Sequence, residues 1–138
     1  MQDGQTSTER RQLQRKHIFA INGAPEFLDV LRDLLQDEQF NVTTTNYLPQ
    51  TFDQIAAVEP DLIITDLVIG ERAGWELLEH LQAEAITRQI PVLVTSTDQH
   101  LLDRAQGDAA RYGAQRFVVK PLDIDELLQT IHQMIGPA

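Results

Sequence analysis

The sequence predicts an α/β fold in which a doubly wound parallel sheet is built from five successive β/α units. Short apolar runs alternate five times with longer segments whose apolar residues recur at helical spacing. Most of the short runs are apolar throughout, which is typical of parallel strands covered by helices on both faces. A chain of 138 residues with 42% hydrophobic residues is long enough to bury one such core. We therefore expect a single folded domain.

The strands and helices are predicted from the period of the apolar residues. Strands are expected at residues 18–21, 40–44, 62–65, 92–95 and 117–119, and helices at residues 26–37, 52–58, 75–81, 101–112 and 124–135. The second strand alternates apolar and polar residues, which predicts a position near an edge of the sheet. Pro25 suits a helix start and Gly113 a helix end, and Asp123 with Glu126 resembles a capping box at the start of the last helix.

The composition excludes several classes of protein. The chain has no cysteine, which excludes a disulfide framework, thiol catalysis and cysteine-ligated zinc, and fits a reducing compartment. No apolar run is long enough to span a bilayer, and the first residues lack the apolar centre of a secretion signal. We expect a flexible polar leader at residues 1–16, a folded domain at residues 17–138 and a cytoplasmic location.

The charge is distributed unevenly along the chain. The net charge is -10, yet four of the eleven basic residues lie within the leader. The remainder holds 7 basic and 19 acidic residues, a net charge of -12. Because the body is acidic, neither nucleic acid nor an anionic membrane is expected as its partner.

Polar side chains stand directly after four of the predicted strands. Asn22 and Gly23 follow the first strand, Asp66 the third, Ser96 the fourth and Lys120 the fifth. Sites in open α/β sheets lie outside the carboxyl ends of the strands, so these residues are expected to converge on one crevice. A carboxylate, a hydroxyl and an ammonium held together there indicate phosphate chemistry. Asp66 would be the nucleophile, with Lys120 and Ser96 as partners of phosphoryl oxygens.

Each of these residues also has an ordinary structural interpretation. Asp66 could cap the loop after its strand, and Lys120, which precedes a proline, could be an exposed turn residue. Ser96 could belong to the N-cap region of the fourth helix, and Asn22 with Gly23 is a common turn pair. The four histidines are scattered without the spacing of metal ligands. The functional interpretation is favoured because the polar residues fall at four strand ends of one predicted sheet.

Four spaced motifs carry a resemblance to a known family. They are residues 60–66, which end in Asp66; residues 74–78, which begin with Gly74; residues 91–96, which end in Ser96; and residues 113–121, which contain Phe117, Lys120 and Pro121. Over about residues 17–135 the chain resembles the receiver domains of bacterial two-component response regulators. The resemblance implies a flavodoxin-like (βα)5 sheet with strand order 2-1-3-4-5. It also implies that Asp66 is a phosphoacceptor and that Ser96 and Phe117 form a switch.

The resemblance implies partners as well. A sensor histidine kinase or a phosphotransfer protein would supply the phosphoryl group, and a downstream protein would bind the face formed by the fourth helix, the fifth strand and the fifth helix. The last helix shows no unusual apolar stripe, so we expect a monomer or a weak homodimer. If residues 1–138 are the whole gene product, the domain stands alone and its output is another protein.

The chain departs from the family at the metal site. The first strand of a receiver usually ends in two acidic residues that help to hold Mg²⁺, and here Asn22 and Gly23 stand in their places. The remaining ligands would be the Asp66 carboxylate, the backbone carbonyl of Val68 and, weakly, the Asn22 amide. Mg²⁺ prefers anionic oxygen ligands, so we expect weak or absent binding and slow phosphorylation of Asp66. We also expect Lys120 to pair with Asp66 in the resting state.

Three functions from different classes follow from these residues. The first is a receiver domain of a phosphorelay whose Mg²⁺-dependent phosphorylation is impaired. The second is a pseudo-receiver, a protein-binding module that works without phosphorylation. The third is a flavodoxin-like or phosphatase-type enzyme, which is disfavoured because Val68 stands two positions after Asp66, where a second aspartate would be needed, and because no glycine-rich phosphate loop follows the first strand.

Overall fold

A computed structural model describes residues 15–138, so residues 1–14 of the predicted leader lie outside its described part. The strands are β1 (His17–Ile21), β2 (Asn41–Thr45), β3 (Leu62–Asp66), β4 (Val92–Ser96) and β5 (Arg116–Val119). The helices are α2 (Pro25–Asp37), α3 (Thr51–Val58), α4 (Ala73–Ala83), α5 (Ala85–Arg88), α6 (Gln99–Gly107), α7 (Ala109–Tyr112) and α8 (Ile124–Ile135). The alternation of strands and helices predicted from the sequence is therefore confirmed.

The five strands form one parallel sheet with the order β2-β1-β3-β4-β5. This confirms the predicted doubly wound fold and its strand order. The order changes direction between β1 and β3, because β2 lies on one side of β1 while the later strands lie on the other. A crevice at the carboxyl ends of β1 and β3 is the expected consequence of such a reversal.

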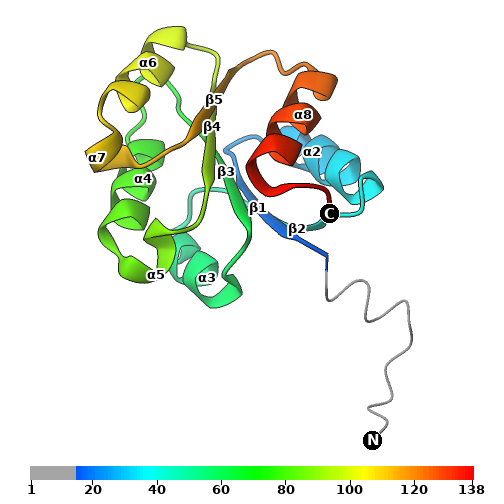
Figure 1. The fold of residues 1–138 in the computed structure, drawn as a ribbon. Helices are drawn as coiled ribbons and strands as arrows, with labels where there is room; N and C mark the ends of the chain where they lie inside the picture. Colours follow the sequence, from blue (N-terminus) through cyan, green and yellow to red (C-terminus); the bar gives the residue numbers. More distant parts are fainter. Residues whose placement is uncertain (1–14) are drawn as a thin grey trace, which may run out of the picture.

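The helices cover the sheet in two layers (Figure 1). α2 and α8 lie on one face, and α3, α4, α5, α6 and α7 lie on the other. Each face has its own apolar core, and alternate residues of the central strands point into the two cores. Ile64 and Leu93, for example, belong to the core under α2 and α8, whereas Ile63 and Val94 belong to the core of the other face. Burial on both faces explains why these strands are apolar throughout.

Several local expectations are confirmed. The second strand lies at the edge of the sheet, and all its residues are only half-buried. α2 begins at Pro25, where its fixed backbone angle suits the first helical turn. Gly113 ends α7 with a φ of 69°, a left-handed conformation that favours glycine. The Asp123 side chain accepts a hydrogen bond from the Glu126 backbone N–H at 3.0 Å and caps α8.

The fourth predicted helix is not continuous, and that expectation was wrong. Asp108 adopts φ -131° and ψ 64°, which separates α6 from α7. Gly107 and Asp108 are both weak helix formers, so the break falls where helical conformation is least favourable. A new helix, α7, begins at the next residue. The Asp108 carbonyl stabilises its first turn by accepting hydrogen bonds from the N–H groups of Arg111 and Tyr112. The short helix α5 was not expected either.

Residues 15–138 contain no helix that is both long and apolar enough to cross a membrane.

Candidate functional site

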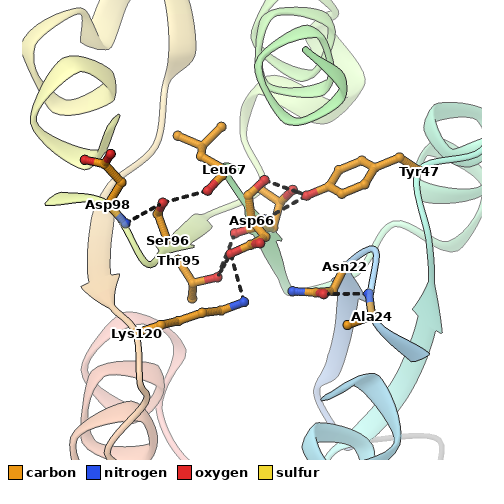
Figure 2. A network of polar contacts seen from close by, with 10 residues as sticks. Asn22, Ala24, Tyr47, Asp66, Leu67, Thr95, Ser96, Asp98 and Lys120 are labelled. Carbon is orange, nitrogen blue, oxygen red and sulfur yellow. Dashed lines mark hydrogen bonds and ion pairs between the residues drawn. The ribbon is translucent and has the colours of Figure 1, made fainter. Parts of the chain in front are cut away.

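Asp66 is the last residue of β3, and its side chain is the centre of a small polar network (Figure 2). Its Oδ1 atom accepts a hydrogen bond from the Thr95 hydroxyl at 2.8 Å and lies 3.1 Å from the Lys120 ammonium nitrogen. Thr95 faces Asp66 because the two residues are register partners in β3 and β4. Asp66 is 7% exposed and Thr95 is 2% exposed, so water screens these contacts only weakly.

Lys120 is brought to Asp66 by the end of β5. Its backbone N–H donates to the Ser96 carbonyl at 2.7 Å, which extends the pairing of β4 and β5 to the site. The peptide bond to Pro121 is cis. The ammonium also lies 4.3 Å from the centre of the Phe27 ring, which belongs to the first turn of α2. The ammonium therefore has a carboxylate on one side and an aromatic face on another.

Ser96 lies near Asp66 but does not contact its carboxylate. Its fully buried hydroxyl donates to the Leu67 carbonyl at 2.6 Å and accepts from the Asp98 N–H at 3.1 Å. The side chain is thus bonded to the segment that follows Asp66 (Figure 2). Asp98 is the cap of α6, since its carboxylate accepts from the His100 N–H at 2.8 Å. Phe117 lies on β5, half-buried against the core covered by α3 to α7.

Asn22 and Gly23 form the turn that leads from β1 into α2. The Asn22 amide oxygen accepts a hydrogen bond from the Ala24 N–H at 2.9 Å, and Figure 2 shows its amide nitrogen on the side that faces Asp66. Asn22 therefore presents a hydrogen-bond donor to the site, while its oxygen is used within the turn. At Gly23 an added Cβ would meet nothing within 4 Å, so the fold has room for a side chain there.

The resemblance to receiver domains implies Mg²⁺ at this position, and the donor atoms present fit that ion poorly. Asp66 supplies a carboxylate, and its Oδ1 already carries two donors. The Val68 carbonyl accepts from the Glu71 N–H at 3.1 Å, and the Asn22 oxygen accepts from Ala24. Within residues 15–138 no group of three or more His, Cys, Asp and Glu side chains is placed to hold a metal ion. Mg²⁺ binds through anionic oxygens in near-octahedral geometry, and this arrangement does not offer them.

Tyr47 holds the backbone of Asp66 and was not anticipated from the sequence. Its hydroxyl donates to the Asp66 carbonyl at 2.6 Å and accepts from the Asp66 N–H at 2.8 Å. The Thr65 hydroxyl lies 2.9 Å away. Burial raises the pKa of Tyr47 to about 12, so the phenol keeps its proton at neutral pH and can donate.

Thr95 and Phe27 were also missed, and their signals in the sequence were weak. Thr95 is a polar residue that follows three apolar residues of β4, and in a parallel sheet it shares its side of the sheet with its register partner Asp66. That signal could have identified it. Phe27 sits at helical spacing with the core residues of α2, so the sequence indicates packing and gives no sign of its contact with Lys120.

Gly74, at the start of α4, lies directly against the backbone of Asp66. A Cβ at this position would come within 2.4 Å of the Asp66 carbonyl oxygen and 3.0 Å of the Leu67 side chain. Only glycine allows α4 to begin this close to the end of β3. The backbone of Asp66 is therefore fixed between Gly74 and Tyr47.

Comparison with known proteins gives sequence relatives and structural neighbours of one kind. The chain is 29% identical over 102 residues to the cell cycle response regulator CtrA of Brucella ovis, covering 74% of this chain and 42% of that protein. It thus spans less than half the length of this relative. The solution structure of a response regulator protein from Burkholderia multivorans has a TM-score of 0.69 and 26% identity, over 91% of this chain and 98% of the other.

A third comparison concerns the fold alone. The receiver domain of the sensor histidine kinase PA1611 from Pseudomonas aeruginosa, solved with a magnesium ion coordinated in its active-site cleft, has a TM-score of 0.70 and 18% identity. The match covers 88% of this chain and 98% of that domain.

The family model of the response regulator receiver domain matches residues 18–132. The matched stretch includes nearly the whole sheet as well as Asp66, Ser96 and Lys120. Receiver domains are signalling domains that interact with histidine kinases or phosphotransfer proteins. With the sheet order, the relatives and this match in agreement, the chain belongs to the response regulator receiver domain family of two-component signalling.

Proposed function

We propose that Asp66 is the phosphoacceptor of this receiver domain and that Lys120 holds it in the resting state. The observation that carries the proposal is the 3.1 Å contact between the Lys120 ammonium and Asp66 Oδ1, with side chains that are 16% and 8% exposed. A carboxylate and an ammonium so little exposed, at the carboxyl end of a parallel sheet, form a site suited to phosphoryl transfer.

The proposed reaction uses the second oxygen of the carboxylate. No residue within 15–138 donates a hydrogen bond to Asp66 Oδ2, whereas Oδ1 is bound by Thr95 and Lys120. Oδ2 attacks the phosphorus of a phosphohistidine in the kinase or phosphotransfer protein. A bond from phosphorus to Oδ2 forms, the bond from phosphorus to the histidine nitrogen breaks, and that nitrogen keeps the electron pair. Lys120 then lies close enough to attract a phosphoryl oxygen.

Two features make this transfer slow. The donor atoms around Asp66 fit Mg²⁺ poorly, so the charge of the incoming phosphoryl group is balanced mainly by Lys120. Ser96 can donate to a phosphoryl oxygen only after it gives up its bond to the Leu67 carbonyl. In the proposed switch of Ser96 and Phe117, the Ser96 hydroxyl therefore starts with its hydrogen bond to the Leu67 carbonyl already formed.

The proposal is tested by incubating the chain with acetyl phosphate, with and without Mg²⁺, and following the intact mass. We expect a slow gain of one phosphoryl group that depends little on Mg²⁺, is lost on acid or hydroxylamine treatment as an acyl phosphate should be, and is absent from Asp66→Asn. Asp125→Asn is a matched control because that carboxylate is exposed in the first turn of α8. Rapid phosphorylation that requires Mg²⁺ would refute the impairment, and a gain that persists in Asp66→Asn would refute the role of Asp66.

A pseudo-receiver is the second candidate function. It is favoured by the fact that Thr95 and Lys120 already satisfy Asp66 Oδ1, so the resting site is stable without a phosphoryl group. The domain would then bind its partner in one fixed conformation, through the face of α6, α7, β5 and α8 that exposes Val119 and Ile124. No phosphoryl gain from acetyl phosphate with or without Mg²⁺, together with weaker partner binding by Asp66→Asn in the absence of a phosphodonor, would select this function.

A further inference from the structure

We propose that Phe27 replaces the missing acidic pair as the second partner of Lys120 and that its ring holds the ammonium against Asp66. Phe27 is then a positioning residue that acts through Lys120. This inference rests on the proposed function only for the role of the Asp66–Lys120 pair, because the contacts themselves are independent of phosphorylation.

The geometry of Lys120 has two anchors on different elements. The ammonium nitrogen lies 3.1 Å from Asp66 Oδ1 at the end of β3 and 4.3 Å from the centre of the Phe27 ring in α2. The second distance is well within the range of about 6 Å in which an aromatic face attracts a cation. Within residues 15–138, Asp66 is the one carboxylate that forms an ion pair with Lys120.

The ring is held in place by the core and the helix that carries it. Phe27 is half-buried and packs against the apolar cluster under α2 and α8. It lies near the start of α2, which begins at Pro25, two residues after Gly23. The two positions that carry acidic residues in most receivers thus supply no charge, and the next helix places an aromatic face over the same ammonium.

An aromatic face can serve the ammonium but cannot serve Mg²⁺. The ring attracts a cation through its quadrupole, which acts on a lysine that is already partly desolvated. Mg²⁺ keeps its water tightly and needs oxygen ligands, which a phenyl ring lacks. Replacing carboxylates by Phe27 therefore keeps Lys120 at Asp66 while the attraction for the divalent ion is lost. The site then favours the Lys120 ammonium over Mg²⁺.

The test compares the reactivity of the two lysines in the full chain. The sequence contains two lysines, Lys16 and Lys120. Lys16 donates to the Ile135 carbonyl, and both of these residues lie far from Asp66 in the sequence. Brief reductive methylation with formaldehyde and cyanoborohydride as the hydride donor, read by peptide mass spectrometry, gives the ratio of labelling at Lys120 to labelling at Lys16. We expect this ratio to rise about threefold to tenfold in Phe27→Leu, because the ring no longer holds the ammonium.

A second variant separates electrostatic attraction from cover by the ring. Pentafluorophenylalanine at position 27 keeps the shape of the side chain and reverses its quadrupole, so the ratio should rise at least as far as in Phe27→Leu. Phe27→Tyr should stay within about twofold of the wild type, because tyrosine keeps the negative face. Phe52→Leu is the matched control, since Phe52 is also half-buried but its ring stacks on His80.

The outcomes distinguish this inference from the proposed function. A pentafluoro variant with the wild-type ratio would show that the ring only covers Lys120, and an unchanged ratio in Phe27→Leu would show that it does not hold Lys120 at all; either result overturns the inference. The labelling requires no phosphodonor. A chain that never becomes phosphorylated would therefore still report on Phe27, and a readily phosphorylated chain with unchanged ratios would reject Phe27 alone.

Discussion

At the scale of single residues, the carboxylate of Asp66 is fixed by one donor in β4 and one that follows the end of β5. Thr95 in β4 and Lys120 after β5 both bind Oδ1, and the other oxygen receives no hydrogen bond from the described residues. Hydrogen bonds to an ionised acceptor are stronger than neutral ones, and this pair lies where water is scarce. Thr95 therefore contributes both to stability and to the orientation of the carboxylate.

Replacing Thr95 by valine should lower the free energy of unfolding by about 1.5–3 kcal/mol, because the shape is kept and a charge-assisted hydrogen bond is lost. Thr95→Ser keeps the hydroxyl and should recover most of the loss. Urea unfolding at neutral pH measures the effect. Thr97→Val serves as the control, since Thr97 is exposed and its change should be near zero. A loss in Thr95→Ser equal to that in Thr95→Val would contradict the role of the hydroxyl.

At the scale of elements, the end of β3 lacks a strand partner on its β1 side. The register of β1 with β3 ends at Ala20 and Ile64, two residues before Asp66. The Tyr47 side chain, from the segment after β2, takes the place of the missing strand and binds both backbone groups of Asp66. An unpaired buried N–H or C=O is costly, so a side chain that satisfies both stabilises the end of this strand.

Tyr47→Phe should lower the stability at neutral pH by about 1–3 kcal/mol, because the backbone groups of Asp66 lose a buried partner. The substitution should also change how the free energy of unfolding depends on pH above pH 8. The pKa of Tyr47 is raised from 10.0 to about 12 in the folded state, so its contribution is complete below pH 10 and is lost as the pH rises toward 12. That loss amounts to about 2–3 kcal/mol in the wild type. Unfolding free energies measured between pH 8 and 12 should fall less steeply in the variant.

The start of α4 gives a second prediction at this scale. Gly74→Ala should destabilise the fold by about 1–3 kcal/mol, because the new methyl group would lie 2.4 Å from the Asp66 carbonyl oxygen. Thermal or chemical unfolding measures the change. Gly107→Ala is the matched control: it lies in α6 with open space around its Cβ and should be neutral or stabilising by up to about 1 kcal/mol. Equal effects of the two substitutions would show that the contact with Asp66 is unimportant.

At the scale of the whole molecule, the opposite end of the sheet carries a histidine whose pKa is lowered by burial. His17 begins β1, and its ring nitrogen lies 2.7 Å from the Thr43 hydroxyl of β2. Burial lowers the pKa of His17 below its usual 6.5, and the nearby Asp61 opposes this only in part. The folded state therefore disfavours the charged imidazole, at the end of the sheet away from Asp66.

The stability of the domain should fall as the pH is lowered from neutrality through the depressed pKa of His17. The unfolded chain takes up a proton near pH 6.5 while the folded chain resists it, so this contribution is present above that pH and is lost below it. Denaturant unfolding between pH 7.5 and 5 measures the effect. His17→Gln should flatten the profile, and His100→Gln, at an exposed position, should leave it unchanged.

The sequence predicts the fold far better than it predicts the site. The alternation of elements and the edge position of β2 follow from apolar periodicity, because burial on both faces leaves a direct mark on the residues. The proximity of Lys120 to Asp66 follows from the rule that strand ends meet. The contacts of Tyr47 and Phe27 could not be predicted from the sequence, because they depend on the directions in which a loop and a helix orient these side chains. The break at Asp108 depends on a balance of propensities too small to read from a pattern.

The turn after β1 has a consequence for how the site could change. Gly23 has open space on the side where a Cβ would stand, so the lack of a second acid there reflects composition and not crowding. A carboxylate could be introduced at this position without repacking the interior, whereas the oxygen of Asn22 is already committed to Ala24. The backbone thus leaves room for an anionic side chain at position 23, and the absence of one there is a matter of side-chain identity and not of backbone shape.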